Sequence, residues 1–110
     1  MKQFTEQDKK WLEEHGAIDI ALYRTGGHCQ YRIRLDDDLE VIFQNNMYDE
    51  DNFECIIHNK YFSVRRKAKT LILAYKMCIS LFETAVTRTM DDKARLFQEF
   101  QKLIAEQEQQ

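Results

Sequence analysis

The stretch from Ser63 to about Thr87 constrains the fold most, because it is the most apolar part of the sequence. Its apolar residues recur at three- and four-residue steps, which is the spacing of one helix face. Further apolar residues leave only a narrow polar line, and such a helix has to be buried on more than one side. The sequence therefore predicts a central helix that Ser63 caps, with a sheet on one side and a second helix or a partner chain on the other. The stripe consists of Val64, Ala68, Leu71, Tyr75, Cys78, Phe82 and Ala85.

The segments before this helix have the pattern of antiparallel strands. Residues 17–24 and 29–35 alternate between apolar and polar side chains, and a turn with two glycines separates them, which predicts a hairpin. Residues 39–44 and 53–58 predict a third and a fourth strand around a long polar loop, and residues 61–62 either start a short fifth strand or pack under the central helix. At the N-terminus, Thr5 to Asp8 resembles a capping box, so we expect a helix that begins there and stops at Gly16.

The helical pattern breaks at Thr87–Arg88, and Thr89 can cap a last helix. Together these segments predict a single α+β domain over residues 1–110. Its expected order is an N-terminal helix, an antiparallel meander of four or five strands, a long central helix, and a C-terminal helix packed on it. The apolar stripe of the last helix is Met90, Ala94, Phe97, Phe100 and Ile104.

Composition narrows the classes of protein. The formal net charge of −3 gives the average surface no attraction for polyanions. Lys76 interrupts the only run that could cross a bilayer, and the N-terminus has no apolar signal core, so we expect no membrane contact and a cytoplasmic location. An odd number of cysteines, three, without a C-x-x-C pair indicates reduced thiols.

Charge is segregated along the chain. From Asp36 to Glu54 there are acidic residues and no Lys or Arg, whereas from Lys60 to Lys76 there are basic residues and no Asp or Glu. Two interpretations stay open. Either the acidic and basic segments neutralise each other on the surface, or one of them meets a charged partner.

The sequence contains no motif for catalysis or for a cofactor. Cys55 and His58 stand three residues apart, which in a strand places them on opposite faces and makes a poor metal site. The acidic run from Asp49 lacks the glycine and the ligand spacing of a calcium loop. We therefore predict a protein that is not an enzyme and has no catalytic residue, metal or cofactor.

The first functional hypothesis is a protein-binding module that uses an acidic lobe to hold a larger protein with a basic surface. Met47 and Tyr48 stand among the acids and would act as anchors. Small acidic domains of this kind resemble phage and mobile-element proteins that inhibit host defence, including anti-CRISPR proteins. The expected contact residues are Asp36, Asp37, Asp38, Met47, Tyr48, Asp49, Glu50 and Asp51.

Two alternatives remain. The basic start of the predicted central helix could contact phosphates of a nucleic acid. This segment resembles the basic helix start of double-stranded-RNA-binding domains, but the stretch before it is longer than in that family and acidic, so we do not adopt the family. The third hypothesis is a structural homodimer held by the apolar helices. The phosphate-binding residues would be Arg65, Arg66, Lys67 and Lys69, with Arg32 and Arg34 as a second patch.

Overall fold

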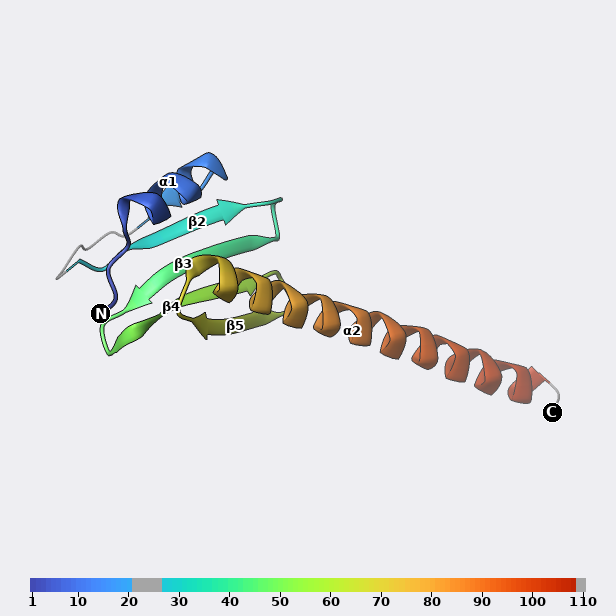
Figure 1. The fold of residues 1–110 in the computed structure, drawn as a ribbon. Coiled ribbons are helices and arrows are strands. Elements are labelled where there is room, and N and C mark those ends of the chain that lie inside the picture. The colour runs from blue at the N-terminus through green and yellow to red at the C-terminus, as the bar shows by residue number, and fades with distance from the viewer. Residues whose placement is uncertain (21–26, 109–110) are drawn as a thin grey trace.

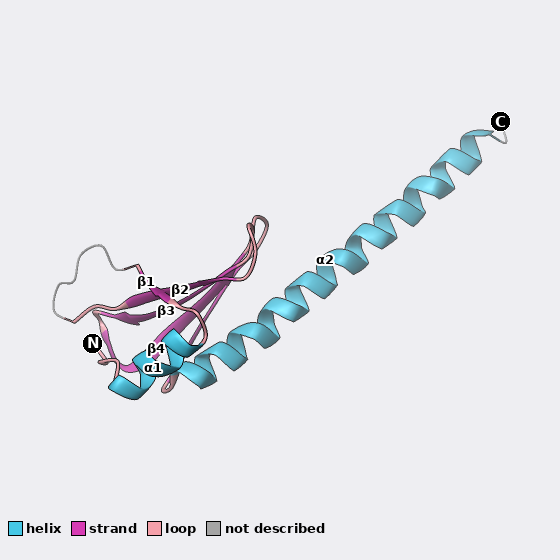
Figure 2. Cartoon of the chain, turned by 90° about the horizontal axis from the view of Figure 1, so that it is seen from above, coloured by secondary structure: helices cyan, strands magenta, loops and turns pink. Residues whose placement is uncertain are grey.

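The computed structural model describes residues 1–20 and 27–108, and within them the chain forms two helices and one five-stranded sheet (Figure 1). All neighbouring strands pair antiparallel, in the order β1-β2-β3-β4-β5. Both helices lie on the same side of the sheet (Figure 2). The predicted α+β class, an N-terminal helix, an antiparallel sheet and helix after it, is confirmed. The elements are α1 (Glu6–Glu14), β1 (Ile18–Asp19), β2 (Gln30–Arg34), β3 (Glu40–Asn46), β4 (Asp49–His58), β5 (Ser63–Ala68) and α2 (Leu71–Glu108).

The first helix forms where the capping box predicted it. The Asp8 backbone N–H donates to Thr5 Oγ1 at 3.1 Å, and the Thr5 N–H donates to Asp8 Oδ2 at 2.9 Å. Gly16 ends the helical turn with a φ of 79°, which a residue with a side chain rarely adopts. Trp11 docks the helix by placing its ring edge-on to Phe43, 5.7 Å between centroids. The short α1 is therefore fixed by its cap, by the aromatic contact of Trp11 with the sheet, and by Leu12, which is fully buried in the core.

Alternation in the strands gives the sheet one helix-covered face and one open face. On the helix-covered face Tyr31 lies opposite Phe43, and Ile33 lies opposite Val41. Their strand neighbours point to the open face, on which no described helix lies (Figure 2). The strand predicted over 17–24 is realised as the short β1, and its last residues, with the start of the following turn, lie outside the described residues.

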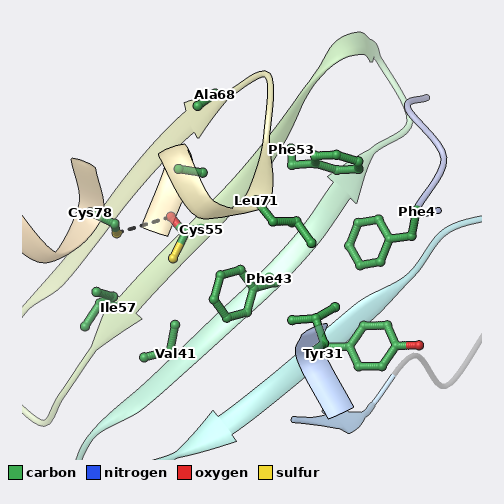
Figure 3. Close-up of a cluster of buried hydrophobic side chains, with 12 residues drawn as sticks. Phe4, Tyr31, Val41, Phe43, Phe53, Cys55, Ile57, Ala68, Leu71 and Cys78 are labelled. Atoms are coloured by element: carbon green, nitrogen blue, oxygen red, sulfur yellow. Dashed lines mark hydrogen bonds between the residues drawn. The ribbon is translucent and has the colours of Figure 1, made fainter. Parts of the chain in front are cut away.

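The core lies between the helix-covered face and the first turns of α2 (Figure 3). Phe43 and Cys55 on the sheet are fully buried, and Leu71 and Cys78 of α2 are buried against them. Tyr75 joins the two helices to the sheet, because its ring contacts those of Trp11 and Phe43. The apolar stripe predicted for the central helix thus does face the sheet, but only from Leu71 onward.

The predicted start of the central helix is wrong. Ser63 does not cap a helix, because residues 63–68 form β5 and pair with β4, with Val64 opposite Ile57. The helix begins at Leu71, where Thr70 caps it by accepting the Leu73 N–H at 3.1 Å. The error has a simple cause: the four-residue spacing of Val64 and Ala68 fits one face of a helix and also one face of a strand.

The predicted break at Thr87–Arg88 does not form either. The residues expected to make a separate last helix are helical, but they continue α2 without interruption to Glu108, so they do not pack back on it. No Gly or Pro follows Gly27 in the sequence, so nothing in the chain stops a helix there. Within the described chain no second helix covers the other side of α2, because Ile72, Leu73 and Met77 are 41–47% exposed. Burial of that side by a partner chain stays a prediction.

No helix in the described part of the chain combines the length and the apolar character that a bilayer span requires.

A buried amide ties the N-terminal segment and the β1–β2 connection to β3. Asn45 is 1% exposed. Its Oδ1 accepts the Cys29 N–H at 2.9 Å, and its Nδ2 donates to the carbonyls of Lys2 at 2.9 Å and Gly27 at 3.1 Å. One side chain therefore satisfies three backbone groups from two segments that are distant in sequence.

Replacing Asn45 with Ala should lower the free energy of unfolding by about 2–4 kcal/mol, because three backbone groups lose their partner in a buried place. Urea unfolding followed by the fluorescence of Trp11 measures this. The matched control is Asn46→Ala, which removes an oxygen that accepts only from the nearby Tyr48 N–H and should cost less than about 1 kcal/mol. Equal losses in the two variants would contradict this role of Asn45.

Candidate functional site

The most exposed aromatic ring among the described residues lies at the turn between β3 and β4. Asn46 pairs with Asp49 across this turn, and the two residues between them are Met47 and Tyr48. The side chain of Tyr48 is 92% exposed and that of Met47 is 58% exposed. The predicted long polar loop is therefore a tight turn that presents both anchors to solvent.

The Asp49 carboxylate orders the backbone that follows the turn. Its Oδ1 accepts the N–H groups of Asp51 at 3.0 Å and Asn52 at 3.1 Å, and its Oδ2 accepts Asn52 Nδ2 at 3.1 Å. These hydrogen bonds, the Asn52 side chain first, lower the pKa of Asp49. Lys67 Nζ lies 4.0 Å from the same carboxylate. Asp49 is therefore a structural residue of the turn and presents little free charge.

Glu50 and Asp51 carry the uncompensated charge beside the anchors. Both are exposed, and no cation of the described residues forms an ion pair with either carboxylate. Lys2 lies close to Asp51, but its ammonium group donates to the backbone carbonyl oxygens of Asp51 and Lys69. We call Met47, Tyr48, Glu50 and Asp51 the β3–β4 tip.

The other predicted acids lie at the far end of β3. Asp36, Asp37 and Asp38 form the turn between β2 and β3, and Asp36 Oδ1 accepts the N–H groups of Asp38 and Leu39. β3 connects this turn to the β3–β4 tip, and its length separates them by about 20 Å (Figure 1). The single acidic lobe predicted from the sequence is therefore two separate acidic turns.

The four predicted phosphate-binding cations do not make one patch. Arg65, Arg66 and Lys67 are on the edge strand β5, and Lys69 follows it. Alternation places Arg65 and Lys67 on the open face, and there Arg65 pairs with Glu54 at 3.5 Å while Lys67 pairs with Asp49. Arg66 is on the other side, where it lines a shallow groove with Lys76 and Met77 of α2. Two of the four charges are thus compensated within the fold.

Sequence reasoning missed two glutamates on the open face. Glu40 accepts Arg34 at 3.0 Å, and it also lies 3.9 Å from Arg32 and 3.2 Å from His58 Nε2. The second predicted basic patch, Arg32 and Arg34, is therefore paired as well. The signal was available, because Arg34, Glu40 and His58 occupy the same row of the predicted antiparallel pairing.

The second missed glutamate is buried. Glu54 is 1% exposed, and its Oε1 accepts Gln44 Nε2 at 2.6 Å beside the Arg65 guanidinium. Its other oxygen has no hydrogen-bond partner among the residues that the structure describes. Arg65 is the one cation of the described residues that pairs with this buried carboxylate, so Arg65 is held to the sheet and is a poor candidate for an outside partner.

The cysteines are placed for packing. Cys55 and Cys78 are buried in the core, and Cys78 Sγ donates to the Cys55 carbonyl at 3.4 Å. Burial raises the pKa of both thiols, so both are protonated at neutral pH. Cys55 faces the helices, whereas His58 faces Glu40 on the open face, as their odd spacing indicates. Within residues 1–20 and 27–108, no three His, Cys, Asp or Glu side chains converge on a possible metal position.

No protein-family model, no curated protein and no solved structure matches this chain. The function therefore has to be argued from the geometry of the two acidic turns, the β3–β4 tip and the helices.

The Glu40 ion pairs predict a pH-dependent stability. The hydrogen bond from Arg34, first of several causes, lowers the pKa of Glu40 below its ordinary value of 4.5. A carboxylate whose folded pKa is lowered stabilises the fold above the unfolded pKa and loses this contribution as pH falls through the folded value. Glu40→Gln should therefore lower the free energy of unfolding at pH 7 by about 0.5–1 kcal/mol, since the partners are partly exposed.

Urea unfolding at pH 7 and again at about pH 3 measures this difference. We expect the gap between wild type and Glu40→Gln to narrow in acid, because the contribution of the Glu40 carboxylate is lost as the pH falls through its folded pKa. Asp37→Asn is the control, since Asp37 is exposed and in no ion pair with a described residue, and it should leave stability unchanged at pH 7. A gap that is as wide in acid as at neutral pH would contradict the assignment.

Proposed function

We propose that this protein is a non-enzymatic protein-binding module whose contact surface is the β3–β4 tip. The observation that carries the proposal is the exposure of Tyr48, 92%, next to Met47 at 58%. Aromatic and Met side chains are enriched at protein interfaces, where a few buried anchors supply most of the binding energy. Because both side chains are exposed, they add little to the stability of the fold itself.

The tip is also ordered before any partner arrives. Asn46 Oδ1 accepts the Tyr48 N–H at 2.9 Å, and Asp49 fixes the backbone of Asp51 and Asn52. A contact surface whose backbone is already held loses less conformational entropy on binding than a free loop. The same hydrogen bonds favour a specific orientation of Tyr48 toward a partner.

The charge around the anchors indicates the chemistry of the partner. Glu50 and Asp51 are uncompensated by described cations, so a basic surface would be attracted to the tip and an acidic one repelled. A basic groove that normally holds nucleic acid is one such surface. In its more specific form, the proposal is that the protein is an inhibitor of the phage or mobile-element type, which binds such a basic groove.

Quantitative affinity capture from cells that naturally produce the protein tests the proposal, with the full chain as bait. Tyr48→Ala and the double variant Glu50→Lys/Asp51→Lys should lose the same captured protein, and that protein should carry a basic surface. With the purified partner, Tyr48→Ala should weaken binding by about 2 kcal/mol, roughly thirtyfold. The matched control is Asp37→Lys/Asp38→Lys, which makes the same charge change at the distant turn and should keep the partner.

Capture that is equal for the wild type and both tip variants would refute the tip as the contact surface. The nucleic-acid alternative has its own measurement: fluorescence anisotropy of a short labelled duplex across a salt series. Phosphate contacts make affinity fall steeply with salt. Binding at low salt that Arg66→Glu abolishes, and that Tyr48→Ala leaves intact, would favour this alternative over the protein-binding proposal.

A further inference from the structure

β5 is the last strand of the sheet, and no described strand pairs with its outer side (Figure 1). The hydrogen bond from the Asn59 N–H to the Phe62 carbonyl, 2.9 Å long, closes the turn between β4 and β5. From there, hydrogen-bonded and non-hydrogen-bonded residue pairs alternate along an antiparallel ladder. The backbone N–H and C=O groups that point outward, away from β4, are therefore those of Ser63, Arg65 and Lys67. We call these backbone groups the β5 edge.

The β5 edge is open to an added strand. Its three residues are exposed, and no backbone group of the described residues pairs with it. The Arg65 carbonyl accepts the guanidinium of the neighbouring Arg66 at 2.9 Å, which leaves its second lone pair for another donor. An edge of this kind is a template for an extended segment. Main-chain hydrogen bonds then provide affinity, and side chains at alternate positions provide specificity.

The shallow groove beside the β5 edge, on the helix-covered side, carries unpaired positive charge. Arg66 lines it from β5, and Lys76, Met77 and Leu81 line it from α2. No acid of the described residues forms an ion pair with either cation. Met77 is 41% exposed, and Leu81 is half-buried. The groove therefore offers two cations next to two apolar side chains.

The open side of β5 differs, because its cations already have partners. Arg65 lies 3.5 Å from Glu54, and Lys67 lies 4.0 Å from Asp49. A strand added to the β5 edge would therefore meet free positive charge only with the side chains that turn toward the groove.

Charge also decides which kind of strand fits. A second copy of β5 is a poor occupant, because an antiparallel pair centred on Arg65 would place this side chain opposite the same cation of the other copy. A parallel pair in register would place every cation level with itself. Like charges directly opposite each other destabilise a sheet, and edge cations of this kind prevent pairing between copies. An acidic strand would meet favourable charge at the same positions.

We propose that the β5 edge binds an extended acidic segment of another protein, which pairs with β5 as an added strand. One face of this segment enters the groove, with an acidic residue beside Arg66 and Lys76. An apolar residue two positions away, on the same face, packs on Met77 and Leu81. The other face of the segment needs no charge. The residues of the β3–β4 tip take no part in this site, so the inference does not rest on the proposed function.

Fluorescence anisotropy of a labelled synthetic peptide, titrated with the full chain, tests the site. The peptide has about eight residues, with Thr at every second position and Glu and Val in turn between them, so that one face is neutral and the other fits the groove. We expect saturable binding at about 100 μM protein or below. A peptide with Lys in place of Glu should bind at least about tenfold more weakly, because the groove repels it.

Two variants of the chain separate backbone pairing from charge. Lys67→Pro removes an outward N–H, and proline is tolerated on an edge strand where the N–H faces solvent. It should weaken peptide binding about tenfold, whereas Lys67→Ala keeps the N–H and should bind like the wild type. Arg66→Glu should also weaken binding at least about tenfold, and Lys10→Glu, the same charge change on α1, should not. Far-UV circular dichroism and the fluorescence of Trp11 show that each variant is folded.

N-methylation of alternate peptide amides tests the pairing from the other side and needs no variant of the chain. Only one of the two alternate sets of amides faces β5, so one methylated peptide should lose binding and the other should keep it. Equal binding of both would refute strand addition.

A wild type that does not bind the Glu-containing peptide, or that binds the Lys-containing peptide as tightly, would overturn the proposal. A short duplex that binds the wild type more tightly than the peptide, and binds Lys67→Pro equally well, would assign the groove to phosphate contacts instead. Arg66→Glu leaves Met47 and Tyr48 in place, so this variant should lose the peptide and still be captured at the β3–β4 tip. The failure of one proposal is therefore distinguishable from the failure of the other.

Discussion

The structure depends on one contact layer, formed where the first turns of α2 lie on the helix-covered face of the sheet. Phe43 sits at its centre, fully buried, and Leu71 and Cys78 of α2 are buried in the same cluster, with Cys78 lying over Cys55. Tyr75 and Trp11 bring α1 into the same layer through ring contacts. Apolar side chains outside this layer are either exposed, as Ile72 and Met77 are, or covered by their neighbours on the sheet, as Ile56 is.

The open face of the sheet is mostly polar, although Ile42 and Ile56 lie opposite each other on it and Ile56 is only 8% exposed. It has no described helix on it, so its stability comes from rows of side chains across the strands. One row is organised by Glu40, with Arg34 at 3.0 Å, and another by Glu54, which accepts Gln44 at 2.6 Å. Arg32 and Arg34 pair with Glu40, and Arg65 pairs with Glu54. These arginines therefore have partners within the fold, although the sequence alone does not show it.

The parts of the fold that sequence predicts well are those with a local physical signature. The capping box at Thr5 needs only two residues to be recognised, and the strict alternation of 29–35 allows only a strand. The prediction for the stretch around Val64 is wrong because a four-residue spacing fits one face of a helix and one face of a strand. Only the pairing with β4 decides that this stretch is a strand.

The prediction of a single acidic lobe is wrong for a different reason. Asp36 and Asp49 are close in sequence, but β3 lies between them. Because a strand is extended, β3 places these two acids at opposite ends of the sheet. Exposure of Tyr48 could not be predicted either, because it depends on the tight turn that Asn46 and Asp49 build.

Besides the β5 edge, the core layer leaves two surfaces uncovered, the β3–β4 tip and the part of α2 beyond Phe82, and these differ in size and charge. The β3–β4 tip is small, preordered and acidic, which suits electrostatic steering and a few anchor residues, whereas α2 beyond Phe82 is a long, regular helix that exposes Phe97 and Leu103. A partner held at the tip would be held by two anchor side chains and two carboxylates. Its affinity would therefore depend on how well Met47 and Tyr48 fit the partner, more than on the area of the contact.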